Sequence, residues 1–217
     1  MKNVLEIDSV QFGWGESLNL SNVYLKSETG RATGVLGRNG CGKSTLFKLI
    51  FGDIRTSKKS VRINGNILFG DYLNPAELRM LPQFNFLPKH LKVTSVFRDF
   101  CVDYNEFCSI FNEFYSYTDS KICHLSGGNV RIIEIYLILK SNSQFCILDE
   151  PFSHLSPINA SAFVDLIRNE KTKKGIIISD HMYKYVVDIS DDLYLVEDAA
   201  VLRVEDLSRL VKYGVDM

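Results

Sequence analysis

The chain has 217 residues, of which 46% are hydrophobic and 24% charged, and its formal net charge is -1. This composition is typical of a soluble globular protein with one α/β domain, or one domain with a small lobe, and it excludes the strongly basic balance of many nucleic-acid-binding proteins. No apolar run reaches the roughly 18 residues of a membrane-spanning helix, and the N-terminal segment lacks the apolar core of a signal peptide.

Strands are predicted first along the chain, in residues 2–12 and 18–36, with turns between them. Apolar residues alternate there, as at Leu5 and Ile7. A hairpin is predicted at residues 64–66, because their sequence Asn-Gly-Asn favours the tight turn between antiparallel strands. The first third of the chain is therefore expected to be mostly antiparallel strand around one loop and helix.

That loop is the segment 37–44, GRNGCGKS, which lies between an apolar strand and a helical pattern. It matches the phosphate-binding pattern G-x-x-x-x-G-K-[ST]. Glycines let the backbone curl so that several N–H groups converge on one anion, and the following helix adds the positive end of its dipole. Lys43 is expected to reach the β- and γ-phosphates and Ser44 to ligate Mg²⁺. The alternative is a turn without a ligand. The expected nucleotide-binding residues are Gly37, Arg38, Asn39, Gly40, Cys41, Gly42, Lys43, Ser44 and Thr45.

Helices are predicted for residues 75–79, 94–117 and 128–140 in the middle of the chain. The second range is rich in aromatic residues that recur at helical spacing, and we interpret these rings as packing contacts rather than as a cofactor site. They are Phe97, Phe100, Tyr104, Phe107, Phe111, Phe114 and Tyr115.

The third helix follows the sequence HLSGGN, in which Ser126, Gly127 and Gly128 resemble a second anion-binding helix start. One nucleotide needs only one such loop. A second loop therefore indicates that the γ-phosphate is also bound from another direction. The alternative is an N-capping serine followed by a flexible turn.

Two acidic residues, Asp149 and Glu150, end the apolar run FCIL. Such a run is typical of a parallel strand buried on both faces, and ligands bind at the carboxyl ends of these strands. Asp149 is predicted to hold Mg²⁺, and Glu150, which points elsewhere, to polarise the attacking water. The alternative for both is a role as helix-cap or turn acids.

The last third alternates strands, at residues 145–148, 175–179 and 192–196, with helices at about 157–170 and 182–188. This alternation favours a parallel sheet. Because no repeat or linker is visible, residues 1–217 are interpreted as a single domain.

The cysteines are odd in number and form no C-x-x-C pair, so we expect free thiols in a reducing cytoplasm. Cys41 is interpreted as a small residue of the phosphate loop rather than as a modifiable thiol. The five are Cys41, Cys101, Cys108, Cys123 and Cys146.

Taken in order, these motifs resemble the ATP-binding subunit of an ATP-binding cassette (ABC) transporter over essentially the whole chain. GRNGCGKST is similar to the Walker A motif, CILDEP to the Walker B motif and LSGGN to the family signature LSGGQ. LPQFNFLP resembles the glutamine loop with Gln83, and SDH the histidine switch with His181. VQFGW resembles the segment whose aromatic residue stacks on adenine, with Trp14 at that position and Phe12 as the weaker choice.

The resemblance implies a P-loop NTPase core with a mixed, mainly parallel sheet, an N-terminal antiparallel β lobe and a helical lobe at about residues 84–130. It implies that two subunits, identical or different, dimerise head to tail and hydrolyse ATP with Mg²⁺. Each ATP would lie between Lys43 and Ser44 of one subunit and the signature of the other. The signature residues are Ser126, Gly127, Gly128 and Asn129.

The resemblance also implies roles for two motif residues outside the loops. Gln83 would sense Mg²⁺ and the attacking water, and so act as both a metal-site and a catalytic residue. His181 would contact the γ-phosphate and keep Glu150 aligned. Two departures stand out. Asn129 replaces the usual glutamine of the signature, and we expect little loss of nucleotide contacts from this change. Ser156 stands where the family usually has an aspartate that couples the two ATP sites of the dimer, so the coupling of those sites is left open.

The implied partners are a second ABC ATPase subunit and integral membrane permease subunits, with no nucleic acid. Some aromatic residues between Phe84 and Tyr117 would form the groove in which the permease docks. The chain would then lie on the cytoplasmic face of the membrane. The strings LDEPFSHLSP and SDH resemble cassettes of lipopolysaccharide export and branched-chain amino-acid uptake. The alternatives are a non-transport ABC ATPase of translation or DNA repair, a slow-turnover ATP-dependent dimerisation module, and an unrelated P-loop kinase.

Overall fold

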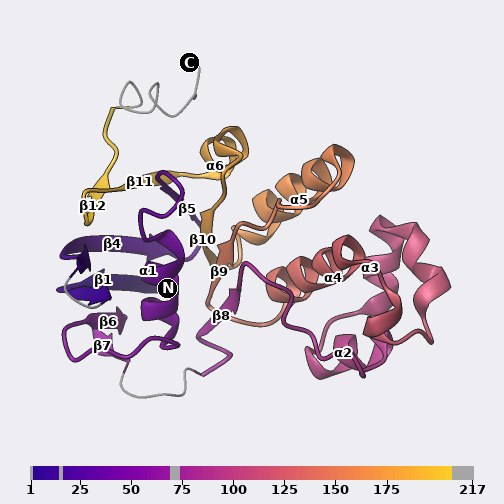
Figure 1. Ribbon diagram of the computed structural model, residues 1–217. Coiled ribbons are helices and arrows are strands. Elements are labelled where there is room, and N and C mark those ends of the chain that lie inside the picture. The colour runs from indigo at the N-terminus through magenta and orange to yellow at the C-terminus, as the bar shows by residue number, and fades with distance from the viewer. Residues whose placement is uncertain (1, 15–16, 69–73, 207–217) are drawn as a thin grey trace.

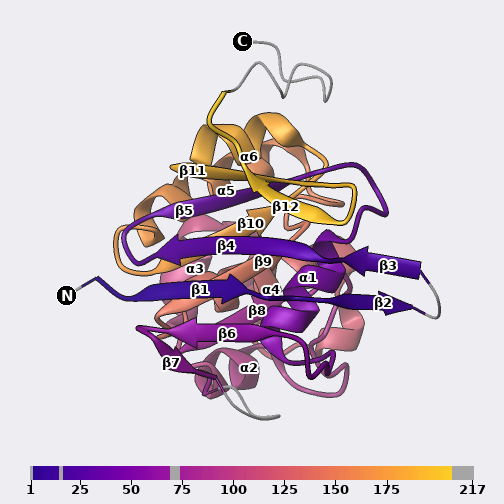
Figure 2. The same cartoon turned by 90° about the vertical axis from the view of Figure 1, so that its left-hand side faces the viewer.

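The computed structural model describes residues 2–14, 17–68 and 74–206, which build a curled ten-stranded sheet with helices on both faces (Figure 1). The strand order is β7-β6-β1-β4-β12-β11-β5-β10-β9-β8. Figure 2 shows the antiparallel half of the sheet in front of the parallel half. The prediction of an α/β fold with a mixed sheet, an antiparallel β lobe and a helical lobe is confirmed.

Five parallel strands form the half of the sheet that carries the predicted motifs. β5, β9 and β10 are buried at every position. In β9, Cys146 and Leu148 pack into one hydrophobic cluster, whereas Phe145 and Ile147 pack into a second cluster on the opposite face. This two-sided burial is the reason why the run lacks polar alternation. The strands are β11 (Asp192–Glu197), β5 (Ala32–Leu36), β10 (Gly175–Ser179), β9 (Phe145–Asp149) and β8 (Leu78–Leu81).

Antiparallel strands form the other half, and one unpredicted strand joins the halves. The predicted hairpin is confirmed, and Asn64 and Gly65 both have positive φ, 52° and 79°, as its tight turn requires. β12 (Ala200–Arg203) pairs parallel with β4 and antiparallel with β11. The antiparallel strands are β4 (Asn22–Glu28), β1 (Val4–Asp8), β6 (Ser60–Ile63) and β7 (Asn66–Ile67), and β2 (Phe12–Trp14) and β3 (Ser17–Leu20) form a separate hairpin.

Helices fill both sides of the curled sheet. α1 (Lys43–Phe51) lies inside the curl and packs with β1, β4 and β6 in the second cluster. On the outer face lie α4 (Gly127–Lys140), α5 (Pro157–Glu170) and α6 (Tyr183–Ile189), all close to their predicted ranges. Among the described helices, none combines the length and apolar character needed to cross a membrane.

Two helix predictions in the middle of the chain are wrong in type or extent. Residues 75–79 are a turn followed by β8, because Leu78 to Leu81 pair with β9 at the sheet edge despite their strong helix propensity. The range 94–117 is broken into shorter pieces, since Asp103 caps a new helix by accepting the N–H groups of Asn105 and Glu106. The pieces are α2 (Val93–Asp99), α3 (Tyr104–Ile110) and the 3-10 helix η1 (Asn112–Tyr117), followed by η2 (Ile122–His124).

Aromatic packing holds this helical lobe together, as the sequence predicts. The ring of Phe107 lies 4.9 Å from Phe97, 4.8 Å from Phe114 and 4.9 Å from Tyr136 between ring centroids. These rings are fully buried, whereas Tyr115 is exposed. Tyr136 belongs to α4, so the stripe packs the lobe against the helix that follows the signature.

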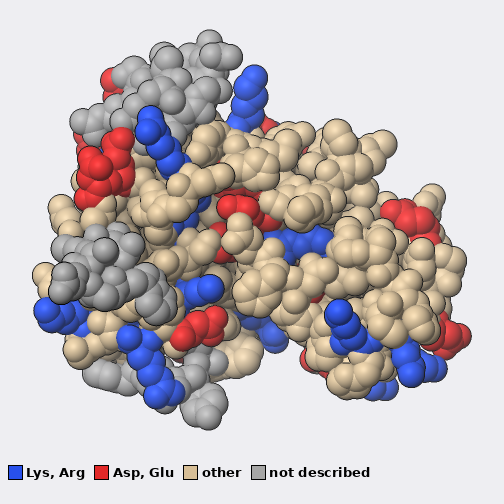
Figure 3. All heavy atoms as spheres, viewed as in Figure 1, with Lys and Arg blue, Asp and Glu red and all other residues tan. Residues whose placement is uncertain are grey.

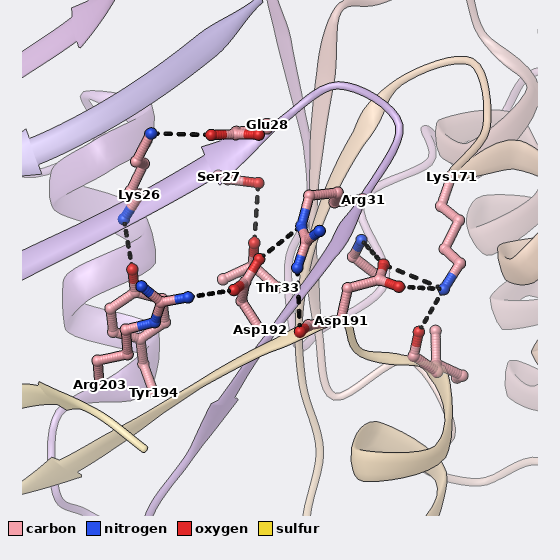
Figure 4. Close-up of polar contacts among 12 residues, drawn as sticks. Lys26, Ser27, Glu28, Arg31, Thr33, Lys171, Asp191, Asp192, Tyr194 and Arg203 are labelled. Carbon is pink, nitrogen blue, oxygen red and sulfur yellow. Dashed lines mark hydrogen bonds and ion pairs between the residues drawn. The ribbon is translucent and has the colours of Figure 1, made fainter. Parts of the chain in front are cut away.

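A group of ion pairs, which we name the polar clamp, fixes the start of β5 to β11 and β12 (Figure 4). Asp192 accepts hydrogen bonds from Arg31 Nε at 2.7 Å and from Arg203 Nη2 at 2.8 Å. Arg31 also donates to the carbonyl of Asp191, whose carboxylate contacts Lys171. The phosphate loop follows the other end of β5, so the clamp anchors the strand that positions this loop.

We expect Asp192→Ala to lower the free energy of unfolding by about 1.5–3 kcal/mol, because it leaves both arginines without their carboxylate. The matched control is Asp188→Ala, whose pair with Arg168 is largely exposed and is expected to contribute about 0–1 kcal/mol. Urea unfolding measures both. A loss no larger than the control's would show that the clamp does not stabilise the fold.

Candidate functional site

The phosphate loop runs from the end of β5 to the start of α1, and its glycines occur where other residues are strained. Gly37 has φ 149°, and a Cβ there would lie 2.6 Å from the carbonyl oxygen of Val196. Gly42, with φ 110°, is the N-cap of α1, and no side chain caps this helix. The first N–H groups of α1 are therefore left for a ligand, as an anion site requires.

Lys43 is a buried cation at the base of this loop. Its side chain is only 6% exposed, and Nζ donates to the carbonyls of Gly37 at 2.7 Å and Arg38 at 3.1 Å. The Tyr183 hydroxyl donates to the same Gly37 carbonyl at 2.9 Å. Of the acidic side chains that the structure describes, none forms an ion pair with Lys43. A buried charge without a counter-ion is stabilised by a bound anion.

A pocket of about 400 Å³ opens above Lys43 and gathers predicted residues from three separate segments. Gln83 follows β8 and Glu150 follows β9, so both reach the pocket from the carboxyl edge of the parallel sheet. The lining residues are Asn39, Gly40, Gly42, Lys43, Ser44, Thr45, Gln83 and Glu150.

Asp149 lies behind the pocket and offers an oxygen without a partner. The residue is 1% exposed, its Oδ1 accepts from the Ser179 hydroxyl at 3.0 Å, and its Oδ2 is buried without a hydrogen bond. Burial raises the pKa of Asp149, whereas the nearby hydroxyls of Ser44 and Ser179 act in the opposite direction. An unsatisfied carboxylate oxygen beside a serine hydroxyl is a donor set that suits a hard divalent cation.

Glu150 points into the pocket because its backbone turns sharply after β9. Its φ is 48°, an uncommon value for a residue with a Cβ, and its N–H donates to the carbonyl of Ser179 at 2.8 Å. Its Oε2 accepts from Gln83 Nε2 at 2.7 Å and from the Ser153 hydroxyl at 3.4 Å. In this state Gln83 and Glu150 satisfy each other across the pocket.

His181 follows β10 at the same sheet edge but does not line the pocket. Its side chain is about half exposed, and Nδ1 lies 3.2 Å from Asp180 Oδ1. Asp180 is fully buried and accepts the N–H groups of Phe152 and Met182, each at 2.9 Å. Burial raises the pKa of Asp180. Asp180 was not predicted from the sequence, although its place beside the predicted His181 was a signal.

The signature residues lie apart from the pocket in this chain. Ser126 is exposed and caps α4, since its hydroxyl accepts the N–H of Asn129 at 3.2 Å. Gly127 and Gly128 form the first turn of α4, and none of the four residues is among those that line the pocket. Ser156 caps α5 by accepting the N–H of Asn159 at 3.3 Å, so its hydroxyl has a local structural role.

The predicted adenine platform is only partly described. Trp14 ends β2, but its side chain lies outside the part of the chain whose side chains are described. Phe12 is half-buried and packs against the second hydrophobic cluster. Cys41 is a partly buried free thiol, and burial raises its pKa. The raised pKa makes it a poorer nucleophile, which agrees with its interpretation as a loop residue.

Two charged residues of α4, Arg131 and Glu134, were not predicted from the sequence to belong near the site. In the structure every side chain from Val130 to Leu139 is buried. Burial raises the pKa of Glu134, while the N–H groups of Leu87 and Phe86 act in the opposite direction. The signal in the sequence was the pair of opposite charges within the apolar run VRIIEIYLIL.

Comparisons with known proteins agree with the motifs. A family model described as ABC transporter matches residues 20–153. The lipopolysaccharide export system ATP-binding protein LptB of Acidithiobacillus ferridurans is 26% identical over 93% of this chain and 90% of its own. An ABC transporter ATP-binding protein of Rhizobium meliloti is 30% identical over 84% of this chain and 73% of its own. A solved ATP-binding subunit of an ABC transporter superposes with a TM-score of 0.82 at 22% identity and covers 98% of this chain and 94% of its own.

Proposed function

This chain belongs to the ABC transporter family, and we propose that it binds ATP between two subunits and that the resulting dimerisation drives a membrane permease. It is an ATP-binding subunit and an ATPase. The observation that carries the proposal is the pocket in which Lys43, Gln83 and Glu150 surround the uncapped start of α1. We propose that residues 1–217 act as one ABC ATPase domain, with a helical lobe at about residues 84–130.

The proposed roles follow from the chemistry of each group. N–H groups of the phosphate loop and the Lys43 ammonium would bind the phosphates. Glu150 would accept a proton from the attacking water, because its carboxylate faces the pocket. Gln83 would have to release Glu150, which it contacts at 2.7 Å, before the water can bind there.

We propose Mg²⁺ as the metal, held by Asp149 Oδ2 and the Ser44 hydroxyl, with Gln83 beside it. The buried oxygen of Asp149 without a partner supports this assignment. Mg²⁺ uses few protein ligands and completes its shell with phosphate oxygens and water, which fits a site without a dedicated group of acids. When bound, it neutralises developing phosphate charge.

The signature would complete the site of a second subunit. Ser126, Gly127, Gly128 and Asn129 are exposed or half-buried at the start of α4, and they do not line the pocket of their own chain. A head-to-tail dimer would bring them to the γ-phosphate from the opposite side. His181, also outside the pocket, would reach the γ-phosphate in that closed state.

Trp14 is proposed to stack on adenine, and Trp14→Ala is expected to weaken ATP binding by about 1–2 kcal/mol, the contribution of one stacking contact. Titration with a fluorescent ATP analogue measures this change. The matched control is Tyr115→Ala, which removes an exposed aromatic residue of the helical lobe. Unchanged affinity in the Trp14 variant would move the adenine platform to Phe12.

A second pocket, of about 290 Å³, is the proposed groove for the permease. Pro82 lines this groove and the next residue, Gln83, lines the nucleotide pocket, so one segment adjoins both sites. Phe86 and Phe100 provide two of its apolar walls, as the docking prediction for the aromatic region requires. Arg79 stacks on Phe100 within the groove, 5.0 Å from its ring centroid.

The charges on the visible face do not favour the nucleic-acid alternative. On the face shown in Figure 3, acidic and basic side chains are interspersed without a continuous basic stripe that could follow a phosphate backbone. The slow-turnover alternative is disfavoured because Lys43, Asp149, Glu150 and His181 are all present.

The experiment that tests the function is a tagged pull-down from gently solubilised native membranes, with the bound proteins identified by mass spectrometry. A polytopic membrane protein at stoichiometric yield is expected, and an Arg79→Glu bait, altered inside the groove, is expected to recover much less of it. The matched control bait is Arg168→Glu, at an exposed site on α5. Recovery of ribosomal or DNA-repair proteins, or of no membrane protein, would overturn the proposed transport function. The assignment as an ATPase would still stand.

A further inference from the structure

α4 carries two charged side chains inside an otherwise apolar and buried segment. Arg131 is 3% exposed and Glu134 is 0% exposed. Burying a charged side chain is costly unless it has well-placed polar partners, so these two residues need a specific reason to lie there. Their partners are backbone groups of the segments that carry Gln83 and Glu150.

Arg131 joins the residue before Gln83 to the two acids of the site. Its Nη1 donates to the carbonyl of Pro82 at 2.6 Å, and its Nη2 donates to the carbonyls of Asp149 at 2.9 Å and Glu150 at 3.0 Å. The planar guanidinium fixes the directions of these bonds, which a flexible ammonium group does not do.

Glu134 holds the other end of the glutamine segment. Its Oε1 accepts the N–H groups of Phe86 at 2.6 Å and Leu87 at 3.0 Å. Its Oε2 lies 3.8 Å from Arg131 Nη1 and makes no hydrogen bond. The residues between the two anchors, 83–85, are exposed, and Asn85 Nδ2 donates to the carbonyl of Gly127 at 3.3 Å, so this stretch also contacts the first residue of α4.

The same guanidinium supports the strained backbone of Glu150. A φ of 48° is unfavourable for a residue with a Cβ and persists only where neighbours hold it. For Glu150, Ser179 holds the N–H and Arg131 holds the carbonyl. Loss of the second contact would let the peptide relax and carry the carboxylate away from the pocket.

We propose that Arg131 and Glu134 are positioning residues that make Gln83 and Glu150 move with the start of α4, where the signature lies. Because Arg131 also contacts Pro82, which lines the proposed permease groove, the same contacts connect α4 with that groove. This inference rests on the proposed function, because it assumes that Gln83 and Glu150 act on the nucleotide.

The test is Arg131→Met in the full chain, which keeps the buried stem and removes the guanidinium. We expect kcat for ATP to fall about 10²-fold, the effect of displacing catalytic groups by roughly 1 Å. The affinity for ATP is expected to stay within about twofold, since Arg131 has no contact with the phosphate loop. Arg131→Lys lacks the planar fork of the guanidinium, so its kcat is expected to lie nearer that of Arg131→Met than that of the wild type.

A double-mutant cycle separates positioning from stability. If Arg131 acts through Glu150, Arg131→Met is expected to lower turnover far less in a Glu150→Gln background than in the wild type. The matched control is Lys174→Met, which removes another buried cation, one that donates to the carbonyl of Ser141 away from the site. It is expected to lower the melting temperature but to leave kcat within about twofold.

Should Arg131→Met not fold, Glu134→Gln provides the second test, because it keeps an oxygen for Phe86 and Leu87 but removes the charge. An about tenfold lower kcat with unchanged affinity is expected. Normal kcat in the folded variant, or full additivity with Glu150→Gln, would overturn the inference. A wild-type chain without ATPase activity would instead overturn the proposed function.

Discussion

Glu150→Gln is expected to lower ATP turnover by about 10²–10⁴-fold and to leave an ATP-bound dimer that does not dissociate. Glutamine has the shape of glutamate, and its amide oxygen can still accept the hydrogen bond from Gln83, so the pocket should keep its form. The amide cannot take a proton from the attacking water. Binding energy would then close the two subunits without the reaction that separates them.

Phosphate release at saturating ATP measures the turnover, and light scattering with Mg²⁺ and ATP measures the dimer. The matched control is Glu113→Gln, the same change at an exposed site in the helical lobe, which is expected to hydrolyse ATP like the wild type. Turnover within about threefold of the wild type would assign the base to another group. A monomer under these conditions, even with the membrane partner present, would contradict the dimeric arrangement.

Lys43→Met is expected to weaken ATP binding by about 3 kcal/mol, or roughly 100-fold, and to abolish measurable turnover. Methionine keeps the apolar stem in its buried position, so the change removes mainly the ammonium group and its hydrogen bonds to Gly37 and Arg38. Without this charge the pocket loses a buried cation that would bind the phosphates.

Isothermal titration with ATP and Mg²⁺ measures the affinity directly. The matched control is Lys58→Met, an exposed lysine on the loop after α1, which is expected to bind ATP like the wild type. A melting curve of both variants without nucleotide shows whether the loop still folds. Wild-type affinity in a folded Lys43 variant would place the phosphates outside this loop and overturn the proposed site.

Local sequence was sufficient for the phosphate loop, the buried strands and the final helices. The loop could be predicted because Gly37 and Gly42 need backbone angles that other residues rarely adopt. β9 and β10 could be predicted because burial on both faces permits only apolar residues along their length. In these segments, local preference and tertiary position favour the same structure.

Tertiary contacts overrode local preference in other segments. The sequence at β8 consists largely of strong helix formers, yet it pairs with β9 because the open sheet edge offers a continuous row of backbone partners. β12 pairs with β4, more than 170 residues earlier in the chain, and no local pattern encodes such a distant pairing. Both strands depend on a sheet that forms elsewhere.

The sequence by itself therefore determined the family, the phosphate loop and the acid pair, because each depends on residues that are neighbours in the chain. Only the tertiary structure decided which groups meet: that Gln83 reaches Glu150, that Asp149 keeps an oxygen free, and that α4 is buried on all sides. Arg131 was not among the residues predicted from the sequence. Its partners come from positions 82, 149 and 150, which only the folded chain brings to one guanidinium.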